Sequence, residues 1–229
     1  MKIFLDTADV NAIKEHLETG LIDGVTTNPT LILKSGRDPV QTIKELVEAG
    51  VPDISAEVVA DTSEGMLKQA EEYIKLGSAV TIKVPCTPEG LKTCKILALE
   101  RQVKVNVTLI FSVAQAILAA KVGATYVSPF IGRVDDHGFD GVHLVEKIAK
   151  VYREHMVRTF VLAASTRSVN DVEKAFEVGS DVVTMPVKVF DKMYNNILTE
   201  KGLDLFNNDW KKATHTLQKP KPYKDVEGL

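Results

Sequence analysis

One lysine stands in the middle of an apolar, β-branched run, Val80–Pro85 (VTIKVP). A lysine on such a strand can point outward, with its stem on the apolar surface and its ammonium group in water. If it points into a desolvated site instead, burial disfavours the ammonium form and favours a neutral amine. A neutral amine attacks carbonyl carbon to form a Schiff base, which weakens a neighbouring carbon–carbon bond by withdrawing its electrons. Lys83 is therefore the candidate nucleophile, and the outward-pointing lysine is the alternative.

Two carboxylates are candidates for the proton transfers that Schiff-base chemistry requires. Asp6 ends the first apolar run, and Glu57 interrupts the apolar sequence Ser55–Val59 (SAEVV). A carboxylate within an apolar strand is costly unless a partner or a hydrogen bond compensates for its burial. Thr108, in the fifth run, can hold a water molecule between the two carboxylates. The simpler alternative for Asp6 is a helix cap.

Neutral polar residues and two arginines end other runs, in positions that suit a phosphorylated sugar. Asn28, Asn106 and Ser165 can exchange hydrogen bonds with sugar hydroxyl groups. Arg133 and Arg167 follow the sixth and seventh runs, and a guanidinium group binds phosphate through two parallel hydrogen bonds. The alternatives are a helix cap for Asn28 and surface ion pairs for the two arginines.

Eight short apolar runs, each followed by a segment with helical periodicity, must position these residues. The helical segments carry apolar residues three and four positions apart, as at Val113, Ile117, Leu118 and Val122. The predicted strands are Lys2–Asp6, Gly24–Asn28, Ser55–Ala60, Val80–Pro85, Val103–Ile110, Thr125–Ile131, Thr159–Ser165 and Val182–Val187. The predicted helix caps are Asp9, Thr62 or Ser63, Ser112 and Asn170, and the terminating glycines are Gly20, Gly50, Gly77, Gly123 and Gly179.

Strict alternation of strands and helices predicts a parallel sheet with right-handed crossovers. Eight such units favour a closed (β/α)8 barrel, or TIM barrel, over an open doubly wound sheet, which usually has fewer strands. We predict one domain over residues 1–217, in which Phe206–Leu217 forms an extra C-terminal helix containing Trp210, and a flexible tail over residues 218–229. Because active sites of such barrels lie at the carboxyl ends of the strands, the polar residues above should meet there.

Composition narrows the classes of partner. The net charge is −3, from 28 basic and 31 acidic residues, which does not favour nucleic-acid or membrane-surface binding. The sequence contains neither a bilayer-length apolar stretch nor a signal-peptide pattern. Cys86 and Cys94 lack metal-ligand spacing, and we expect reduced thiols and a cytoplasmic protein. We interpret the run 135–137 (DDH) as a solvated turn or a helix start and expect no metal site.

Several motifs, in order along the chain, resemble the transaldolase family. They are Phe4–Ala8 (FLDTA), Gly24–Thr30 (GVTTNPT), Ile82–Pro85 (IKVP), Asn106–Ser112 (NVTLIFS) and Tyr126–Arg133 (YVSPFIGR). The similarity covers about residues 1–217, and the chain length matches the short members of the family. The resemblance implies that a dihydroxyacetone unit is transferred from sedoheptulose 7-phosphate or fructose 6-phosphate to glyceraldehyde 3-phosphate or erythrose 4-phosphate, in the pentose phosphate pathway. It implies no cofactor, and a homo-oligomer of five subunits or of two stacked rings of five.

The resemblance also implies a role at each matching position. Lys83 is similar to the Schiff-base lysine, and Asp6 is similar to the acid–base group for the C4 hydroxyl of the donor. The pair that holds the catalytic water resembles Glu57 and Thr108. The hydroxyl-binding residues resemble Asn28, Asn106 and Ser165, and the phosphate site resembles Arg133 and Arg167.

The nearest alternative is fructose-6-phosphate aldolase, a related subgroup with the same lysine. That subgroup has glutamine where this chain has Glu57, and tyrosine where it has Phe130. A tyrosine hydroxyl there would help to protonate the enamine and release free dihydroxyacetone, whereas phenylalanine would exclude water. We therefore expect transfer rather than simple cleavage. A phosphosugar-binding barrel without catalysis is the more distant alternative.

Overall fold

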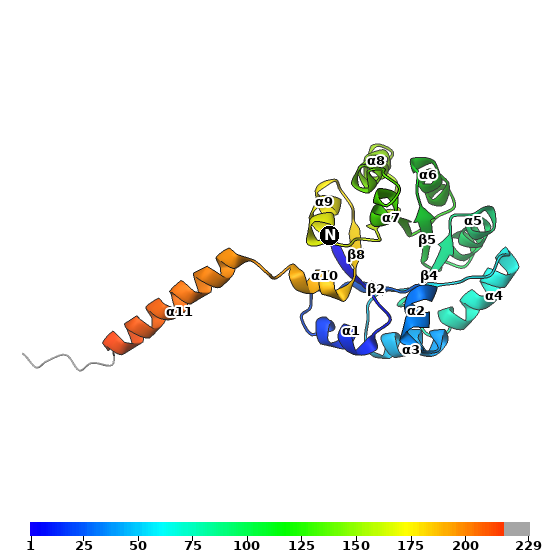
Figure 1. Cartoon of the computed structure of the whole chain (residues 1–229). Helices are drawn as coiled ribbons and strands as arrows, with labels where there is room; N and C mark the ends of the chain where they lie inside the picture. The colour runs from blue at the N-terminus through cyan, green and yellow to red at the C-terminus, as the bar shows by residue number, and fades with distance from the viewer. Residues whose placement is uncertain (218–229) are drawn as a thin grey trace, which may run out of the picture. The chain divides into compact units, whose positions relative to one another are not determined.

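The structure, a computed structural model, describes residues 1–217, with side chains through residue 214 (Figure 1). Its strands are β1 (Lys2–Asp6), β2 (Gly24–Thr26), β3 (Ile54–Glu57), β4 (Val80–Pro85), β5 (Val105–Ile110), β6 (Tyr126–Pro129), β7 (Phe160–Ala163) and β8 (Val182–Met185). Each strand pairs in parallel with the next, and β8 pairs with β1. The predicted (β/α)8 barrel is thereby confirmed. The predicted tail, 218–229, lies outside the described residues.

Helices connect successive strands and surround the barrel (Figure 1). They are α1 (Val10–Leu17), α2 (Pro29–Ser35), α3 (Pro39–Glu48), α4 (Ser63–Ile74), α5 (Pro88–Lys95), α6 (Val113–Lys121), α7 (Ile131–Asp135), α8 (Gly141–Glu154), α9 (Val169–Glu177) and α10 (Val187–Lys192), and a π-helical turn, Ile96–Glu100, continues α5. The five predicted terminating glycines all have positive φ angles, the backbone conformation that glycine adopts without steric cost.

Side-chain caps set where most of these helices begin. Asp9, Thr62 and Ser112 accept hydrogen bonds from backbone N–H groups in the first turns of α1, α4 and α6, as predicted. The predicted cap Asn170 is wrong. Ser168 caps α9 instead, and the Asp171 side chain accepts a hydrogen bond from the Ser168 backbone in return, which completes a capping box.

Most strands are shorter than the apolar runs that predicted them. The run predicted as the sixth strand extends to Ile131, but β6 ends at Pro129 and α7 begins at Ile131. Phe130, between them, makes one isolated parallel bridge to Ala164. Apolar residues continue past the paired segment because the start of the next helix is also buried, as Ile131 shows.

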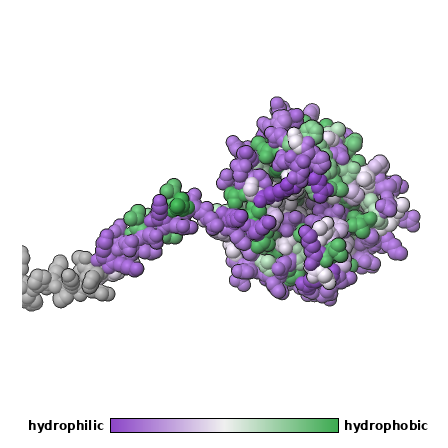
Figure 2. All heavy atoms as spheres, viewed as in Figure 1, coloured by the Kyte–Doolittle hydropathy of each residue, from purple (hydrophilic) through white to green (hydrophobic). Residues whose placement is uncertain are grey.

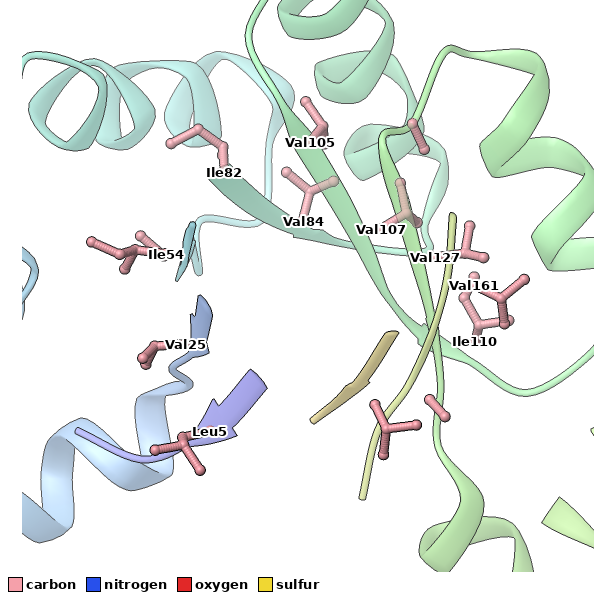
Figure 3. Packing of buried hydrophobic residues seen from close by; sticks show 14 of the residues in the cluster. Leu5, Val25, Ile54, Ile82, Val84, Val105, Val107, Ile110, Val127 and Val161 are labelled. Carbon is pink, nitrogen blue, oxygen red and sulfur yellow. The ribbon is translucent and has the colours of Figure 1, made fainter. Parts of the chain in front are cut away.

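The main apolar core lies between the strands and the helices. It combines one face of each strand with the inner faces of the helices, for example Ile82 and Val84 of β4 with Ile43 and Leu46 of α3 within one cluster. Figure 3 shows its strand residues from β1 to β7, including Leu5, Val25, Ile54, Val105 and Val161. Because side chains alternate along a strand, the intervening residues, such as Lys83, face the barrel interior.

A second, smaller cluster fills the barrel interior below the strand ends. It contains Phe4, Tyr126, Leu162, Ala164 and Val182, and the Phe4 and Tyr126 rings meet edge to face at 6.0 Å. Gly24 makes room for this packing, since a Cβ atom there would lie 2.6 Å from the Phe4 ring. The interior beneath the carboxyl ends is therefore a packed plug, which confines any ligand to the mouth.

The C-terminal helix belongs to a unit of its own. The contacts within the chain divide it into Met1–Phe190 and Asp191–Leu229. In the second unit, α11 spans Ile197–Leu217, so it begins earlier than the predicted Phe206. Asn196 explains the earlier start, because its side chain accepts a hydrogen bond from the Leu198 backbone N–H. The domain boundary that we predict at residue 217 stays a prediction. No helix in the described part of the chain has the length and apolar composition of a membrane span.

Candidate active site

A small cavity of about 140 Å³ opens at the carboxyl ends of the strands. It is lined by Asp6, Thr26, Asn28, Lys83, Ser128, Phe130, Arg133, Leu162, Ala164, Ser165 and Thr184. The four even-numbered strands contribute one polar residue each: Thr26 from β2, Lys83 from β4, Ser128 from β6 and Thr184 from β8. Side chains from alternate strands form such layers of four inside (β/α)8 barrels. The cavity therefore has a polar floor above the apolar plug.

Lys83 points into the barrel rather than outward to solvent. Only 5% of the residue is exposed. Its Nζ lies 2.9 Å from a Glu57 carboxylate oxygen and donates a hydrogen bond to the Thr27 backbone oxygen at 3.2 Å. The pairing with Lys83 compensates for the burial of Glu57, the carboxylate that is costly in an apolar strand. An amine in this position can react with the carbonyl carbon of a ligand in the cavity, and a proton acceptor lies beside it.

Asp6 does not cap a helix; Asp9 has that function. Asp6 Oδ1 accepts a hydrogen bond of 2.7 Å from Thr26 Oγ1, and Thr26 Oγ1 lies 2.7 Å from Thr184 Oγ1. Burial raises the pKa of the Asp6 carboxyl above its ordinary value, and the hydrogen bond from Thr26 and the charge of Lys83 oppose that rise. A carboxyl with a raised pKa exchanges protons more readily near neutral pH, which is what a general acid–base group requires.

Asn106 and Thr108 lie deeper in β5, fully buried, and do not line the cavity directly. Asn106 accepts a hydrogen bond from Ser128 at 2.7 Å and donates one to Ser55 at 3.2 Å. Thr108 Oγ1 is the one buried side-chain polar atom among the described residues without a hydrogen-bond partner. A buried hydroxyl without a protein partner is the kind of group that binds an ordered water or a ligand.

Asn28 and Ser165 line the cavity from the ends of β2 and β7. The Asn28 side-chain oxygen caps α2 by accepting a hydrogen bond from the Leu31 backbone, so the helix-cap alternative is also correct. Its amide nitrogen remains as the donor that a ligand could use. Ser165 has a φ of 59°, in the left-handed region that non-glycine residues seldom adopt. Such conformations are often found at functional sites.

The two arginines differ in their surroundings. Arg133, on α7, lines the cavity, and its guanidinium lies 5.0 Å from the centre of the Phe130 ring. Arg167 is exposed, forms a two-pronged ion pair with Asp136, and is not among the cavity-lining residues. The hydrogen bonds from Arg167 lower the pKa of Asp136 below its ordinary value. Gly132 allows this arrangement, because a Cβ atom there would lie 2.6 Å from Arg167 Nε.

Three polar residues of the cavity are not among the predicted site residues: Thr26, Ser128 and Thr184. Small hydroxyl residues are common in strands, so none of them stood out in composition. Strand alternation could have indicated two of them, since Thr26 lies two positions before Asn28 and Ser128 two positions before Phe130. The eighth run contains no predicted site residue, so strand alternation gives no indication of Thr184.

A larger groove, about 830 Å³, lies beside the cavity and shares Arg133 with it. It is walled by α6, α7 and α8 and includes the apolar side chains of Phe111, Phe139 and Leu144. Its lining residues contain no buried nucleophile, so we assign the active site to the smaller cavity. Among the described residues, no three His, Cys, Asp or Glu side chains are grouped to hold a metal ion.

Known proteins resemble this chain over almost its whole length. Residues 3–219 match the family model described as transaldolase/fructose-6-phosphate aldolase. A probable transaldolase from Paracoccus denitrificans is 51% identical over 213 residues, which are 93% of this chain and 98% of the relative. A probable transaldolase from Methanococcus vannielii is 50% identical over 210 residues, 92% of this chain and 97% of the relative.

Among solved structures, 3-hexulose-6-phosphate synthase from Salmonella typhimurium has the same fold. The TM-score is 0.63 with 18% identity, over 81% of this chain and 89% of that one. Identity at that level supports the barrel architecture alone, because one fold supports many functions. The family match and the relatives at about 50% identity, each over almost the whole chain, show more: the chain belongs to the transaldolase/fructose-6-phosphate aldolase family.

Proposed function

We propose that this enzyme is a transaldolase that moves a dihydroxyacetone unit between phosphosugars through a Schiff base on Lys83. One observation carries the proposal: a buried lysine amine stands in a polar cavity at the barrel mouth, 2.9 Å from Glu57 and in the same cavity as Asp6. The donors are sedoheptulose 7-phosphate or fructose 6-phosphate. The acceptors are glyceraldehyde 3-phosphate or erythrose 4-phosphate, which assigns the reaction to the pentose phosphate pathway.

In the first step, the Lys83 amine adds to the ketone carbon of the donor, and loss of water gives a protonated imine. The nucleophile must be the neutral amine, so a group must accept its ammonium proton. Glu57 is within hydrogen-bond distance of Nζ and suits that role. A water held between Glu57 and the unpartnered Thr108 hydroxyl would carry the proton to the departing oxygen.

In the second step, Asp6 takes the proton of the donor's C4 hydroxyl. The C3–C4 bond breaks, its electron pair neutralises the iminium to give an enamine, and C4 leaves as the aldehyde of an aldose phosphate. The acceptor aldehyde then enters, the enamine carbon attacks it, and Asp6 returns its proton to the new alkoxide. Water then adds to the imine carbon and the C–N bond breaks, which releases the new ketose phosphate and restores the Lys83 amine. Asn28, Ser165 and, through its amide, Asn106 are the groups that we assign to the donor hydroxyls.

The phosphate site that we propose uses Arg133 and Arg167. Arg133 already lines the cavity. Arg167 is paired with Asp136, so a phosphate must compete with that carboxylate for the guanidinium. A phosphate dianion is the stronger partner, because it offers more charge and three acceptor oxygens. The exposed ion pair with Asp136 then holds Arg167 near the mouth until substrate arrives.

Simple aldol cleavage is the reaction that competes with transfer. The Phe130 ring lies 5.9 Å from the Phe111 ring, edge to face, and Arg133 stands over its face. This group of two rings and one guanidinium presents no hydroxyl donor to the cavity. Phe130 therefore offers no proton to an enamine beside it, which favours attack on an aldehyde. Glu57 and Phe130 therefore both support transfer over release of free dihydroxyacetone.

We also propose that the protein is a homo-oligomer, a pentamer or decamer. On α11, Leu203, Phe206 and Trp210 share one face by their three- and four-residue spacing, and each is more than half exposed. Figure 2 shows hydrophobic side chains on this helix. An apolar stripe of this kind is expected to be covered by protein.

Free thiols at Cys86 and Cys94 suit a reducing compartment, and we infer a cytoplasmic site of action.

Borohydride trapping followed by a coupled assay tests the function. Wild-type protein mixed with fructose 6-phosphate and borohydride should gain the mass of a reduced adduct on Lys83, and Lys83→Met should gain nothing. Lys83→Arg should also fail, because guanidinium stays protonated and cannot form the imine. Glyceraldehyde 3-phosphate should then appear from fructose 6-phosphate only with erythrose 4-phosphate present. An absent adduct would favour a binding barrel, and release without an acceptor would favour the aldolase.

A further inference from the structure

Two buried threonines in the cavity have no part in the mechanism above. Thr26 on β2 and Thr184 on β8 stand on the strands that flank β1, and are 2% and 3% exposed. Thr26 Oγ1 lies 2.7 Å from Asp6 Oδ1 and 2.7 Å from Thr184 Oγ1. All three side chains line the same cavity. The Asp6 carboxylate is thus the end of a chain of hydroxyl groups that crosses three adjacent strands.

The direction of this chain follows from counting protons. A threonine hydroxyl has one proton to donate, and an ionised carboxylate has none. The contact with Asp6 therefore uses the proton of Thr26, and Thr184 must be the donor in its contact with Thr26. Each bond polarises the next, so donation by Thr184 strengthens the bond from Thr26 to Asp6.

We propose that Thr26, supported by Thr184, is the positioning residue for Asp6: the hydroxyl chain holds Oδ1 as an acceptor and leaves Oδ2 to take the substrate's hydroxyl proton. The inference rests on the proposed function, in which Asp6 is the base. During cleavage the C4 O–H bond breaks and its proton moves to Oδ2. On addition of the acceptor, that proton goes to the new alkoxide. The chain protons stay where they are throughout: Thr26 contacts Asp6, Thr184 contacts Thr26, and neither threonine exchanges a proton with substrate.

The charged groups around Asp6 give the sign of the expected effect. Lys83 faces it from β4 and Glu57 from β3, and Arg133 on α7 lines the same cavity. Burial raises the pKa of Asp6, and the hydrogen bond from Thr26 is the larger of the two influences that lower it. Without that bond the pKa rises further, so Asp6 is ionised only at higher pH. The acid limb of the transfer rate should then move to higher pH.

The test compares two pH profiles in Thr26→Val, which keeps the shape of the side chain and removes its hydroxyl. The first profile is kcat/KM for transfer, which needs ionised Asp6. The second is the rate of borohydride trapping on Lys83 with fructose 6-phosphate, which does not. At the low-pH end, transfer should fall on the order of tenfold relative to wild type, the scale of one hydrogen bond to a charged group. The trapping profile should keep its wild-type position.

Three further variants distinguish positioning from packing. Thr26→Ser restores the donor and should return the acid limb to its wild-type position. Thr184→Val should move the limb in the same direction as Thr26→Val, by less. Thr166→Val is the matched control, because its buried hydroxyl donates to the Thr184 backbone oxygen at 2.8 Å and stands outside the chain. Its acid limb should stay in place.

The outcomes separate this inference from the proposed function. If wild-type protein forms no adduct, the proposed function fails, whatever the threonine variants do. If wild-type protein traps and transfers but Thr26→Val and Thr184→Val both keep the wild-type acid limb, the function stands and the positioning role is wrong. Equal shifts of the transfer and trapping profiles would also overturn it, because the effect would then belong to Lys83. Thr184→Val keeps the test decisive if Thr26→Val does not fold.

Discussion

At the scale of single residues, environment separates the two carboxylates of the site. Glu57 pairs directly with Lys83, while Asp6 accepts a hydrogen bond from a neutral hydroxyl chain. A carboxylate beside an ammonium group is suited to proton exchange with that group. A buried carboxylate with a neutral partner has a raised pKa and is suited to a substrate hydroxyl. The different partners thus support different roles for the same chemical group.

Phe130 is the residue expected to decide between transfer and cleavage. Phe130→Tyr adds a hydroxyl with little change in ring volume, and a well-placed acid contributes roughly 100-fold or more to a proton transfer. We expect cleavage of fructose 6-phosphate without an acceptor to rise and transfer to fall. The double variant with Phe130→Tyr and Glu57→Gln should raise the ratio of cleavage to transfer further. The measurement is free dihydroxyacetone released per transfer event; an unchanged ratio together with lower stability would make Phe130 a packing residue only.

The two arginines should affect phosphorylated substrates selectively. Arg133→Ala and Arg167→Ala should each raise KM for fructose 6-phosphate, by about tenfold or more for a lost charge-assisted hydrogen bond. Activity on unphosphorylated fructose should fall far less. Asp136→Asn should lower KM, because it removes the carboxylate that competes with phosphate for Arg167. Equal losses on both substrates, or a raised KM in Asp136→Asn, would show that the arginines have a structural role.

At the scale of elements, short βα connections fix where each side chain enters the cavity. Asn28 ends one connection and caps the next helix, so its amide has a fixed orientation. Ser165 and Arg167 lie between β7 and α9, and the Gly132 backbone N–H donates to the Ser165 oxygen at 3.0 Å. The connection after β7 is thereby joined to α7, which carries Arg133. The hydrogen bond from Gly132 thus links the connection that carries Arg167 to the helix that carries Arg133.

The start of α9 supports a stability prediction. Ser168→Ala removes the hydroxyl that accepts from the Asp171 N–H and breaks the capping box, which should cost about 1 kcal/mol of unfolding free energy. Asn170→Ala, two residues along, should change it by no more than about 0.5 kcal/mol, since Asn170 is an exposed residue inside the helix. Urea unfolding of both variants measures the difference. If Asn170→Ala lost more unfolding free energy than Ser168→Ala, the cap would be Asn170, as the sequence pattern predicts.

At the scale of the whole molecule, the parallel barrel explains why residues from strands far apart in the sequence meet. Asp6, Lys83 and Thr184 are far apart in sequence, yet parallel strands bring their carboxyl ends to the same mouth. The interior plug around Phe4 and Tyr126 closes the opposite side. A ligand can therefore approach only from the mouth, where the loops carry the arginines.

The apolar stripe of α11 predicts how the molecule assembles. Phe206→Asp and Trp210→Asp place a charge on the stripe and should dissociate the oligomer, because an unpaired charge cannot be buried in an apolar interface. Asn208→Asp adds the same charge away from the stripe and should leave the assembly intact. Light scattering during gel filtration gives the mass of each. A wild-type protein that elutes as a monomer, or an Asn208→Asp variant that dissociates equally, would contradict the proposed interface.

The sequence by itself determined the barrel and singled out Lys83 and Glu57 on its strands. Alternating apolar runs and helical periodicity are local patterns, and eight repeats of them leave few ways to close a sheet. Lys83 and Glu57 stood out because a charge within a β-branched run is costly, and that cost is visible in the sequence alone. The exact strand ends are not visible in the sequence, because apolar residues continue into the helices that follow.

Only the tertiary structure decided which groups touch. Thr26 and Thr184 are ordinary strand residues in the sequence. Thr26 becomes the partner of Asp6, and Thr184 the partner of Thr26, because β8, β1 and β2 are neighbours once the barrel closes. The pairing of Arg167 with Asp136 likewise depends on two connections, after β6 and after β7, which lie side by side because these strands are neighbours. Hydrogen bonds and ion pairs act over a few ångströms, whereas these residues are tens of positions apart. Local patterns carry no record of such contacts; the folded barrel creates them.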